Sequence, residues 1–417
     1  MTEGATDTPS STETPPAPDA GLHYLVGDTI FLRGIEVADA KWGMAWWPSP
    51  FPVSAETLEE LLKKRVPEGA SHHRSRLVIC RRSDGRPIGS ALIDEAQNIE
   101  AEIRLHMDPT LGPAGDEVQG EAIRLILPWL SGERHRPMIR TYIAEGQQTV
   151  RDAATTAGMR PAVRLRQGAW RSGALEDLLI YDYPNPVWTA RLGDPGVGLD
   201  EEMQSPTNPV PPRRSITSVP LPQNALIGSE RLALRPFNTS DADQMARNIR
   251  RESDAGFGHS RFPISAVAVA DWFGEIGKEN PSNDFEVAVV LRESGDIIGE
   301  VGLYDIDWIA RHGETGSWIY GAEHRGSGYG TEAKLLLLEY AFERLGMNMI
   351  WSWVLEANPR SQAALRKQGY RDAGVVNWVG FGPQGFQGAR MFDLLASEWF
   401  AGQAGDERDE QHPTQNR

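Results

Sequence analysis

The sequence predicts an α/β fold, and two neighbouring patterns in its last third carry that prediction. The first is a glycine-rich turn at residues 326–330, which leads directly into an amphipathic stretch with apolar residues at helical spacing. The second is residues 350–355, an apolar, β-branched and aromatic run without a breaker, which is typical of a buried strand. Asn358 and Pro359 then begin another helix, because asparagine caps helix N-termini and proline is favoured in the first turn.

The glycine-rich turn is a candidate anion site. Backbone N–H groups converge where such a turn opens a helix, and the helix dipole favours negative charge there. The spacing of Gly326, Gly328 and Gly330 differs from the dinucleotide-binding G-x-G-x-x-G pattern, and no Lys-Ser/Thr pair follows as in a P-loop. We therefore predict a phosphate or pyrophosphate cradle of another type, with an ordinary tight turn as the alternative.

At these residues the sequence resembles the GNAT superfamily of acyl-CoA-dependent N-acyltransferases. The family signature R/Q-x-x-G-x-G/A, which opens the central helix, is matched by Arg325, Gly328 and Gly330. A second signature, Asn-x-x-Ser/Ala followed by Gly-Phe/Tyr, is matched at residues 358–370. The resemblance covers residues 228–400 and looks most like the RimJ/RimL-type branch, which acetylates protein N-termini or small amines.

The resemblance implies a fold, an acyl donor and a set of donor-binding residues. The fold is a mixed-sheet α+β arrangement, the donor is acetyl-CoA, and no metal is implied. In this family the donor lies between two splayed central strands, and a backbone N–H near the end of the fourth strand binds the thioester carbonyl. The residues implied here are Ile319, Tyr320, Arg325, Gly326, Ser327, Gly328, Tyr329, Gly330, Thr331 and Asn358.

The transfer chemistry needs a base and a proton donor. An amine that attacks a thioester must be neutral, and the departing thiolate needs a proton or a positive field. Glu314, just before the fourth strand, is the favoured base, with Asp305 and Asp307 as the next candidates. The tyrosine that many family members use as the acid is replaced by Leu365, and the resemblance implies Ser361 instead, although serine there also suits helix capping.

Length and composition narrow the class of protein. With 417 residues the chain is long enough for two or three domains, and its net charge of −16 disfavours nucleic acid but suits a cationic amine. No run of 18 apolar residues and no signal-peptide pattern occurs, so we expect no membrane span. The single cysteine, Cys80, suits a reducing cytoplasm and is expected to be a buried, inert thiol.

Composition also divides the chain into segments. Residues 1–20 and 403–417 are polar and are predicted to be disordered tails. The proline-rich stretch 187–227 predicts an extended, semi-rigid linker. Two domains remain, at residues 21–186 and 228–402, and the second carries the glycine-rich turn.

The first of these domains is predicted to be a diverged copy of the second. Residues 27–40 echo residues 231–243, and residues 82–90 echo residues 292–300. The chain is therefore expected to hold two tandem GNAT-like copies joined by the proline-rich linker.

The N-terminal copy is expected to lack a donor site. When Glu121 is aligned with Glu332, residues 114–119 fall opposite the cradle, where two glycines are lost and two carboxylates would repel a pyrophosphate. The same alignment puts Gln147 and Val150 in place of Asn358 and Ser361. Two roles for this copy stay open, a structural platform and a part in acceptor recognition.

These observations predict an N-acetyltransferase that moves an acetyl group from acetyl-CoA to a primary amine. The acceptor is a protein N-terminus or a small-molecule amine, attack is direct, and the C-terminal copy is the catalyst. The alternatives are a non-catalytic acyl-CoA-binding scaffold or sensor, and a transferase with another acyl or aminoacyl donor. We expect a cytoplasmic protein that binds neither nucleic acid nor membranes, and a homodimer is among the expected assemblies.

Overall fold

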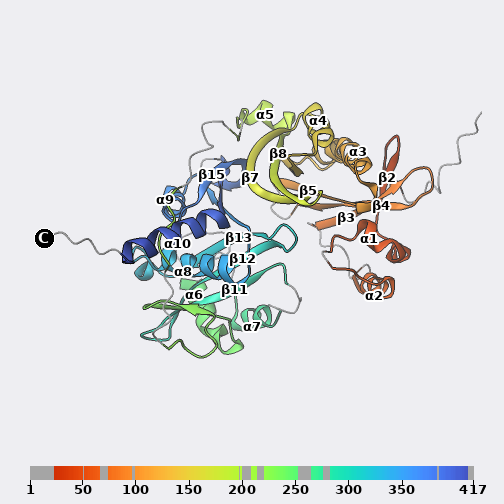
Figure 1. Ribbon diagram of the computed structural model, residues 1–417. Helices are drawn as coiled ribbons and strands as arrows, with labels where there is room; N and C mark the ends of the chain where they lie inside the picture. The colour runs from red at the N-terminus through yellow and green to blue at the C-terminus, as the bar shows by residue number, and fades with distance from the viewer. Residues whose placement is uncertain are drawn as a thin grey trace, which may run out of the picture. The chain divides into compact units, whose positions relative to one another are not determined.

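The structure is a computed structural model, and it describes residues 23–49, 51–65, 74–95, 99–196, 198–199, 208–213, 220–251, 264–275, 282–382 and 385–411 (Figure 1). These residues form two compact units. The first unit extends to Thr141 and includes Gln147–Met159 and Tyr183–Trp188, and the second contains Tyr142–Gly146, Arg160–Asp182 and the chain from Thr189 onward. The predicted tail at residues 1–20 lies outside the described residues.

The second unit is a mixed sheet flanked by helices, as the α/β prediction requires. Neighbouring strands are antiparallel except for one parallel pair, β13 with β14. In sheet order the strands are β8 (Ala174–Pro184), β7 (Arg160–Arg171), β15 (Arg371–Gly382), β16 (Gly385–Leu395), β14 (Met349–Leu355), β13 (His312–Ile319), β12 (Ile297–Asp307), β11 (Phe285–Leu291), β10 (Leu232–Arg235) and β9 (Ile227–Gly228). The helices are α6 (Ala242–Arg251), α7 (Ala266–Glu275), α8 (Tyr329–Glu339), α9 (Pro359–Lys367) and α10 (Ala396–Gln411).

The parallel strands β13 and β14 separate partway along their length. Their pairing ends where Glu314 lies opposite Trp351. Beyond that point β13 stays paired with β12 as far as Ile319, and β14 stays paired with β16 as far as Leu355. A split therefore opens in the middle of the sheet, and we call the point beside Glu314 the base of the split.

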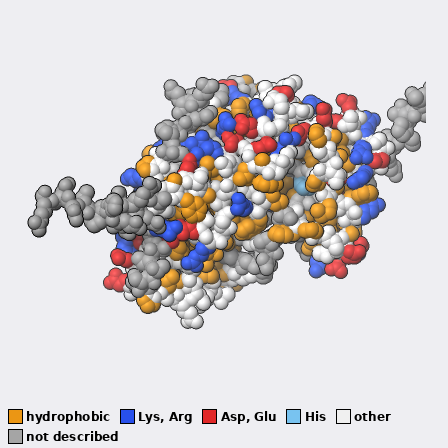
Figure 2. Space-filling view, viewed as in Figure 1, with side chains coloured by type: hydrophobic (Ala, Val, Ile, Leu, Met, Phe, Trp, Pro, Cys, Tyr) orange, Lys and Arg blue, Asp and Glu red, His pale blue; other side chains and the backbone are white. Residues whose placement is uncertain are grey.

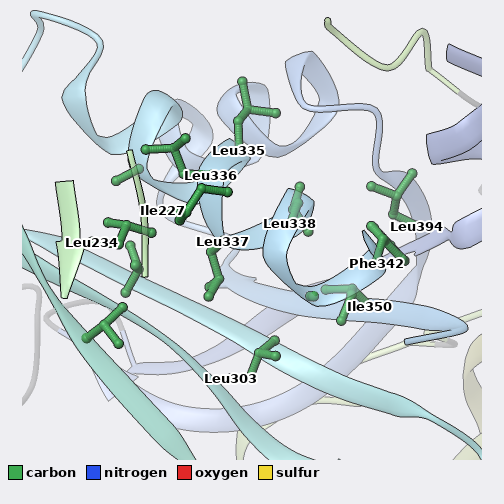
Figure 3. Close-up of a cluster of buried hydrophobic side chains, with 14 of the residues drawn as sticks. Ile227, Leu234, Leu303, Leu335, Leu336, Leu337, Leu338, Phe342, Ile350 and Leu394 are labelled. Carbon is green, nitrogen blue, oxygen red and sulfur yellow. The ribbon is translucent and has the colours of Figure 1, made fainter. Parts of the chain in front are cut away.

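The central helix α8 is buried on every side. Leu335, Leu336, Leu337 and Leu338 are each 1% exposed or less, so the stretch predicted as amphipathic is buried all round (Figure 3). They pack with strand residues that include Leu303 of β12. Each fully buried leucine contributes about 1.5–3 kcal/mol, which makes this helix a main source of the unit's stability.

The opposite face of the sheet is covered by α6 and α7. Met245 of α6 and Phe273 of α7 share a buried cluster with Ala288 of β11 and Tyr320, which directly follows β13. The sheet of the second unit is thus enclosed on both faces, as expected for an α/β layer arrangement.

Strands β7 and β8 precede the linker in sequence but belong to the second unit. Val163 of β7 pairs with Gly374 of β15. Asp393 of β16 is fully buried and accepts hydrogen bonds from the Nη2 atoms of Arg166 and Arg371, each at 2.7 Å. Arg166 also donates to Glu398 of α10 at 2.9 Å, so a buried ionic cluster joins β7 to β16 and α10.

The first unit repeats this plan with its own six strands. Their order is β1 (His23–Val26), β2 (Ile30–Arg33), β3 (Arg74–Arg81), β4 (Pro87–Asp94), β5 (Glu100–Met107) and β6 (Met138–Ala144), of which only β5 and β6 are parallel. The main helices are α1 (Gly43–Trp46), α2 (Ala55–Arg65), α3 (Ala114–Pro128) and α4 (Gln148–Thr156).

Three details show that the two units are copies of one fold. The pairing of β3 with β4 and that of β11 with β12 shift at the same place, after Ile79 and after Val289. Each central helix continues as a short π-helix, at Trp129–Glu133 and at Tyr340–Arg344. An early strand of each unit ends in an arginine that forms a bidentate ion pair, Arg33 with Asp39 and Arg235 with Asp241. The predicted internal repeat is therefore present in the fold.

The described parts of the predicted linker are attached to folded structure. Residues Pro186–Leu192 form helix α5. Val375 donates its backbone N–H to the carbonyl of Gly198 at 2.9 Å, and Asn208 donates to the carbonyl of Tyr370 at 2.5 Å. At the other end, α10 extends to Gln411 and so enters the stretch expected to be a tail.

Two features are absent from the part of the chain that the structure describes. No helix there is both long and apolar enough to cross a membrane, and no cluster of three or more His, Cys, Asp or Glu could hold a metal ion. On the face shown in Figure 2, basic and acidic side chains are interspersed.

Candidate active site

The glycine-rich turn depends on two left-handed residues. Gly326 has φ +84° and Gly328, the N-cap of α8, has φ +83°, a region that residues with a Cβ adopt only with strain. Gly330 lies inside the helix. The first intrahelical bond runs from Glu332 N to Gly328 O at 3.0 Å, so the N–H groups of the first turn point out of the helix end. This is the geometry predicted for an anion cradle.

Side chains from the start of β10 hold this turn in place. Arg231 donates from Nε to Glu332 Oε2 at 2.9 Å and from Nη1 to the carbonyl of Ser327 at 3.1 Å. Its guanidinium also lies over the Tyr329 ring, 4.7 Å from the centroid. The bond to Glu332 raises the pKa of Arg231 above its ordinary value. Glu332, in the first turn of α8, thus anchors the cradle to the sheet.

The end of β13 presents one N–H to the split. The N–H of Tyr320 donates to the carbonyl of Ile298 at 2.8 Å, so it is already used within the sheet. Because N–H groups alternate in direction along a strand, the N–H of Ile319 points away from β12, toward the split. Of the two N–H groups predicted to bind the thioester carbonyl, that of Tyr320 is therefore not free to do so, whereas that of Ile319 points in a suitable direction. Arg325 is tied to the same strand end, since its Nε donates to the carbonyl of Ile319 at 3.2 Å.

Asn358 has the capping role that its position predicts. Its Oδ1 accepts the N–H of Ser361 at 3.1 Å at the start of α9, and Gly369 follows the helix with φ +97°. The Ser361 side chain is partly exposed near this helix start. Leu365, at the position of the usual family tyrosine, is buried in the apolar core with Tyr370.

Three carboxylates on neighbouring strands share the face of the sheet that α6 and α7 cover. Glu300 of β12 accepts a hydrogen bond from the Tyr320 hydroxyl at 2.7 Å, and Glu286 of β11 accepts one from Tyr304. Glu314 of β13 lies opposite Tyr304 in the pairing, which places it on the same face. We call Glu286, Glu300 and Glu314 the carboxylate cluster.

Burial shifts the pKa of two members of this cluster. Burial first, and the charge of Glu286 second, raise the pKa of Glu300 to about 8. Burial likewise raises the pKa of Glu286. Perturbed carboxylates of this kind mark candidate acid–base sites. Sequence reasoning found Glu314 but missed the other two, although each interrupts an apolar strand pattern.

The remaining acidic candidates have structural roles in a turn. Asp307 Oδ1 accepts the N–H groups of Ile309 and Ala310, both at 2.8 Å. Asp305 has φ +49° and donates its N–H to Asp284 Oδ1 at 2.8 Å. Cys80 is buried, as predicted, and burial raises its pKa to about 11, which disfavours the reactive thiolate.

A lysine lies at the base of the split. Lys334 of α8 is 5% exposed, and its Nζ donates to the carbonyl of Thr315 on β13 at 3.3 Å and to Ser352 Oγ on β14 at 3.0 Å. The Thr315 hydroxyl in turn shares a 2.8 Å hydrogen bond with the hydroxyl of buried Tyr370. Burial lowers the pKa of Lys334 to about 7, and the charge of Glu314 opposes that shift. Nothing in the local sequence distinguishes this lysine from one on a helix surface.

The first unit has a continuous helix where the second has its cradle. Helix α3 already begins at Ala114, and Asp116 and Glu117 occupy its first turn. Gln147 donates to Asp116 Oδ1 at 2.9 Å and to Gln119 Oε1 at 3.0 Å. Carboxylates and a side-chain network thus occupy this helix start.

Comparison with known proteins agrees with the site in the second unit. Residues 231–371 match the model of the Acetyltransferase (GNAT) domain. The uncharacterized N-acetyltransferase p20 of Bacillus licheniformis is 25% identical over 175 residues, which cover 41% of this chain and 96% of that protein.

Two solved structures extend the comparison. A Sphaerobacter thermophilus protein, provisionally named an acetyltransferase, is 34% identical over 39% of this chain and 97% of its own, with a TM-score of 0.31. Spermidine N-acetyltransferase from Vibrio cholerae, in complex with CoA and spermine, is 20% identical over 41% of this chain and 99% of its own, with a TM-score of 0.37. The chain belongs to the GNAT superfamily and is an N-acetyltransferase whose acyl donor is acetyl-CoA.

Proposed function

We propose that the second unit transfers the acetyl group of acetyl-CoA directly to a primary amine, either a protein N-terminus or a small-molecule amine. The observation that carries this proposal is the split between β13 and β14. The helix that begins at the glycine cradle packs on one face of this sheet, and the carboxylate cluster lies on the other face. A thioester in the split would meet an amine arriving from the carboxylate face.

The donor is proposed to bind through backbone groups at the cradle. Its pyrophosphate would take the N–H groups at the start of α8, and the N–H of Ile319 would bind the thioester carbonyl. Asn358 and Ser361 would lie near the donor at the start of α9. The residues proposed for the pyrophosphate are Arg325, Gly326, Ser327, Gly328, Tyr329, Gly330 and Thr331.

The acceptor is proposed to be cationic before it reacts. A charged amine is attracted to Glu286, Glu300 and Glu314, and it must lose a proton before its nitrogen can attack. Glu314 is proposed as the proton acceptor, because the pairing of β13 with β14 ends at this residue and the split opens beside it. The Vibrio cholerae spermidine N-acetyltransferase bound to spermine is a precedent for an amine acceptor.

The first unit is proposed to bind no donor. Asp116 and Glu117 at the start of α3 would repel a pyrophosphate, and Gln147 already bonds to Asp116. We also propose residues 21–186 and 228–402, the limits predicted from composition, as the two domains of the chain. They differ from the two compact units, in which β7 belongs to the second unit.

Calorimetric titration with acetyl-CoA tests the proposed function. We expect one site per chain in wild type and none in Gly328→Glu, whose carboxylate would occupy the cradle. Gly346→Glu is the matched control, because Gly346 also has a left-handed φ, +67°, and open space around it, but lies after the helix. Two sites per chain would contradict the inactive first unit. CoA release with spermidine or a peptide amine tests turnover.

A further inference from the structure

The base of the split holds a polar group that the proposed function leaves unused. Lys334 enters it from α8 and bonds to groups of both separating strands, the Thr315 carbonyl and the Ser352 hydroxyl. Its Nζ also lies 5.6 Å from the centroid of the Tyr370 ring. Burying an amine in an apolar core destabilises the charged form, so the fold bears a cost for keeping it there.

The first unit shows what the same position holds when no cradle is present. Glu121 and Glu332 occupy corresponding positions in the two central helices. Each accepts a hydrogen bond from the residue just before the corresponding early strand of its own unit, Thr29 before β2 and Arg231 before β10. Two residues further on, Lys334 therefore corresponds to Ile123, which is fully buried. An isoleucine fills this place in the first unit.

The neighbours of Lys334 change in the same way. Thr141 Oγ1 donates to the carbonyl of Ile103 at 3.0 Å, as Ser352 Oγ donates to the carbonyl of Thr315 at 2.8 Å, so Ile103 stands for Thr315. Met159 N bonds to Ala154 O at 3.0 Å, as Tyr370 N bonds to Leu365 O at 3.2 Å, so Met159 stands for Tyr370.

Three polar residues of the second unit are thus apolar in the first. The first unit builds the same parallel strand pair without them, so the fold itself does not require Lys334, Thr315 or Tyr370. All three occur in the unit that has the glycine cradle. Their polarity is therefore associated with the reaction site rather than with the architecture.

The reaction also needs a proton donor, a role for which the family resemblance implies Ser361. When an amine attacks a thioester, the C–N bond forms, the C–S bond breaks, and its electron pair leaves on sulfur, which must take up a proton. The position of the usual family tyrosine holds Leu365, whose side chain is buried and apolar. A donor reaching the split from the side of α8 would fill this role.

We propose that Lys334 is the general acid of the transfer, giving its Nζ proton to the CoA sulfur as the C–S bond breaks. This rests on the proposed function. One proton of the acceptor ammonium passes through Glu314 to solvent before attack. The second, lost from the nitrogen as the C–N bond forms, goes to Glu314, whose charge interacts with Lys334, and its return to Nζ restores the starting state. The overall change is an amine and acetyl-CoA giving an acetamide and CoA thiol.

This role fixes the sign of a pH effect. The Tyr370 ring lies beside Lys334, and the charge of Glu314 reaches it from the other face of the sheet. Burial lowers the pKa of Lys334 to about 7. Only the ammonium form donates, so its share falls as the pH rises through 7. The wild-type kcat at saturating acceptor should carry a descending limb there.

The experiment compares Lys334→Ile and Lys334→Met with Ile123→Met, which makes a similar change in the first unit. Lys334→Ile installs the residue that the first unit already uses, so we expect it to fold and to bind acetyl-CoA with unchanged affinity by calorimetry. We expect kcat to fall about 100-fold or more and the descending limb to disappear in both Lys334 variants, with Ile123→Met unaffected.

Several results would overturn the proposal. One is wild-type kcat with an unchanged pH profile in folded Lys334→Ile, which would make the lysine structural. Another is loss of acetyl-CoA binding in that variant at unchanged melting temperature, which would make Lys334 a donor-binding residue. If wild type itself failed to bind acetyl-CoA, the proposed function would be wrong, and with it this role for Lys334.

Discussion

Arg231 Nε donates to Glu332 Oε2 across 2.9 Å, joining the residue before β10 to the first turn of α8. The two residues are more than a hundred positions apart in the sequence and share no local motif. They meet at the glycine cradle, where Arg231 also donates to the Ser327 carbonyl. The cradle is therefore shaped by tertiary contacts as well as by its glycines.

Arg231→Ala should weaken acetyl-CoA binding about 5- to 10-fold. Charge-assisted hydrogen bonds contribute about 1.5–3 kcal/mol, and the 46% exposure of the Arg231 side chain reduces this through solvent screening. Calorimetric titration measures the change. Glu121→Gln, which alters the corresponding helix of the first unit, is the control. Equal weakening by both variants would contradict a role specific to the cradle.

Asn358→Ala should lower the free energy of unfolding by about 1 kcal/mol, because the cap on Ser361 N is lost from α9. Chemical denaturation measures the loss. Asn358→Asp keeps an oxygen that accepts the same N–H and should remain close to wild type. If both variants were equally destabilised, the amide nitrogen rather than the cap would be the important group.

Glu300→Gln should reduce the pH dependence of stability. The pKa of Glu300 is raised to about 8, mainly by burial, whereas it is ordinary in the unfolded chain. A raised carboxyl pKa contributes stability that is present at low pH and is lost as the pH rises toward 8. Between pH 5 and 9 the variant should lose about 4 °C less in melting temperature than wild type.

Glu293→Gln is the control for that measurement, because Glu293 is an exposed carboxylate in the turn between β11 and β12. It should follow the wild-type pH profile. A Glu300→Gln profile that coincides with it would show that Glu300 stays ionised in the folded protein.

Asp393→Ala should be the most destabilising of these changes, by about 3–5 kcal/mol or about 10 °C in melting temperature. It leaves Arg166 and Arg371 buried without their shared carboxylate. Asp194→Ala breaks the exposed pair with Arg160 and should cost at most about 1 kcal/mol. Scanning calorimetry measures both. Equal losses would contradict the difference in burial.

Sequence reasoning succeeded where the signal is local. The left-handed glycines at 326 and 328, the cap at Asn358 and the strand at 350–355 each follow from neighbouring residues, and all are present in the structure. The repeat was found because its turn and strand motifs recur in the same order.

The missed residues depend on which strands meet. Glu286 and Glu300 belong to one cluster only through the pairing of β11 with β12, which no short motif specifies. Lys334 directly precedes four leucines, and in an amphipathic helix it would lie on the surface. It lies in the interior because α8 is buried on every side. The N–H direction that separates Ile319 from Tyr320 likewise needs the register of β12.

The place of β7 and β8 means that the second unit is not encoded in one continuous stretch of the chain. These strands are encoded before the linker, yet they complete the sheet of the second unit and bring Arg166 to Asp393. A gene shortened to its last half would leave β15 with an unpaired edge, and such edges promote aggregation. Any fragment meant to fold as the second unit must therefore begin before the linker, at or before Arg160 where β7 starts.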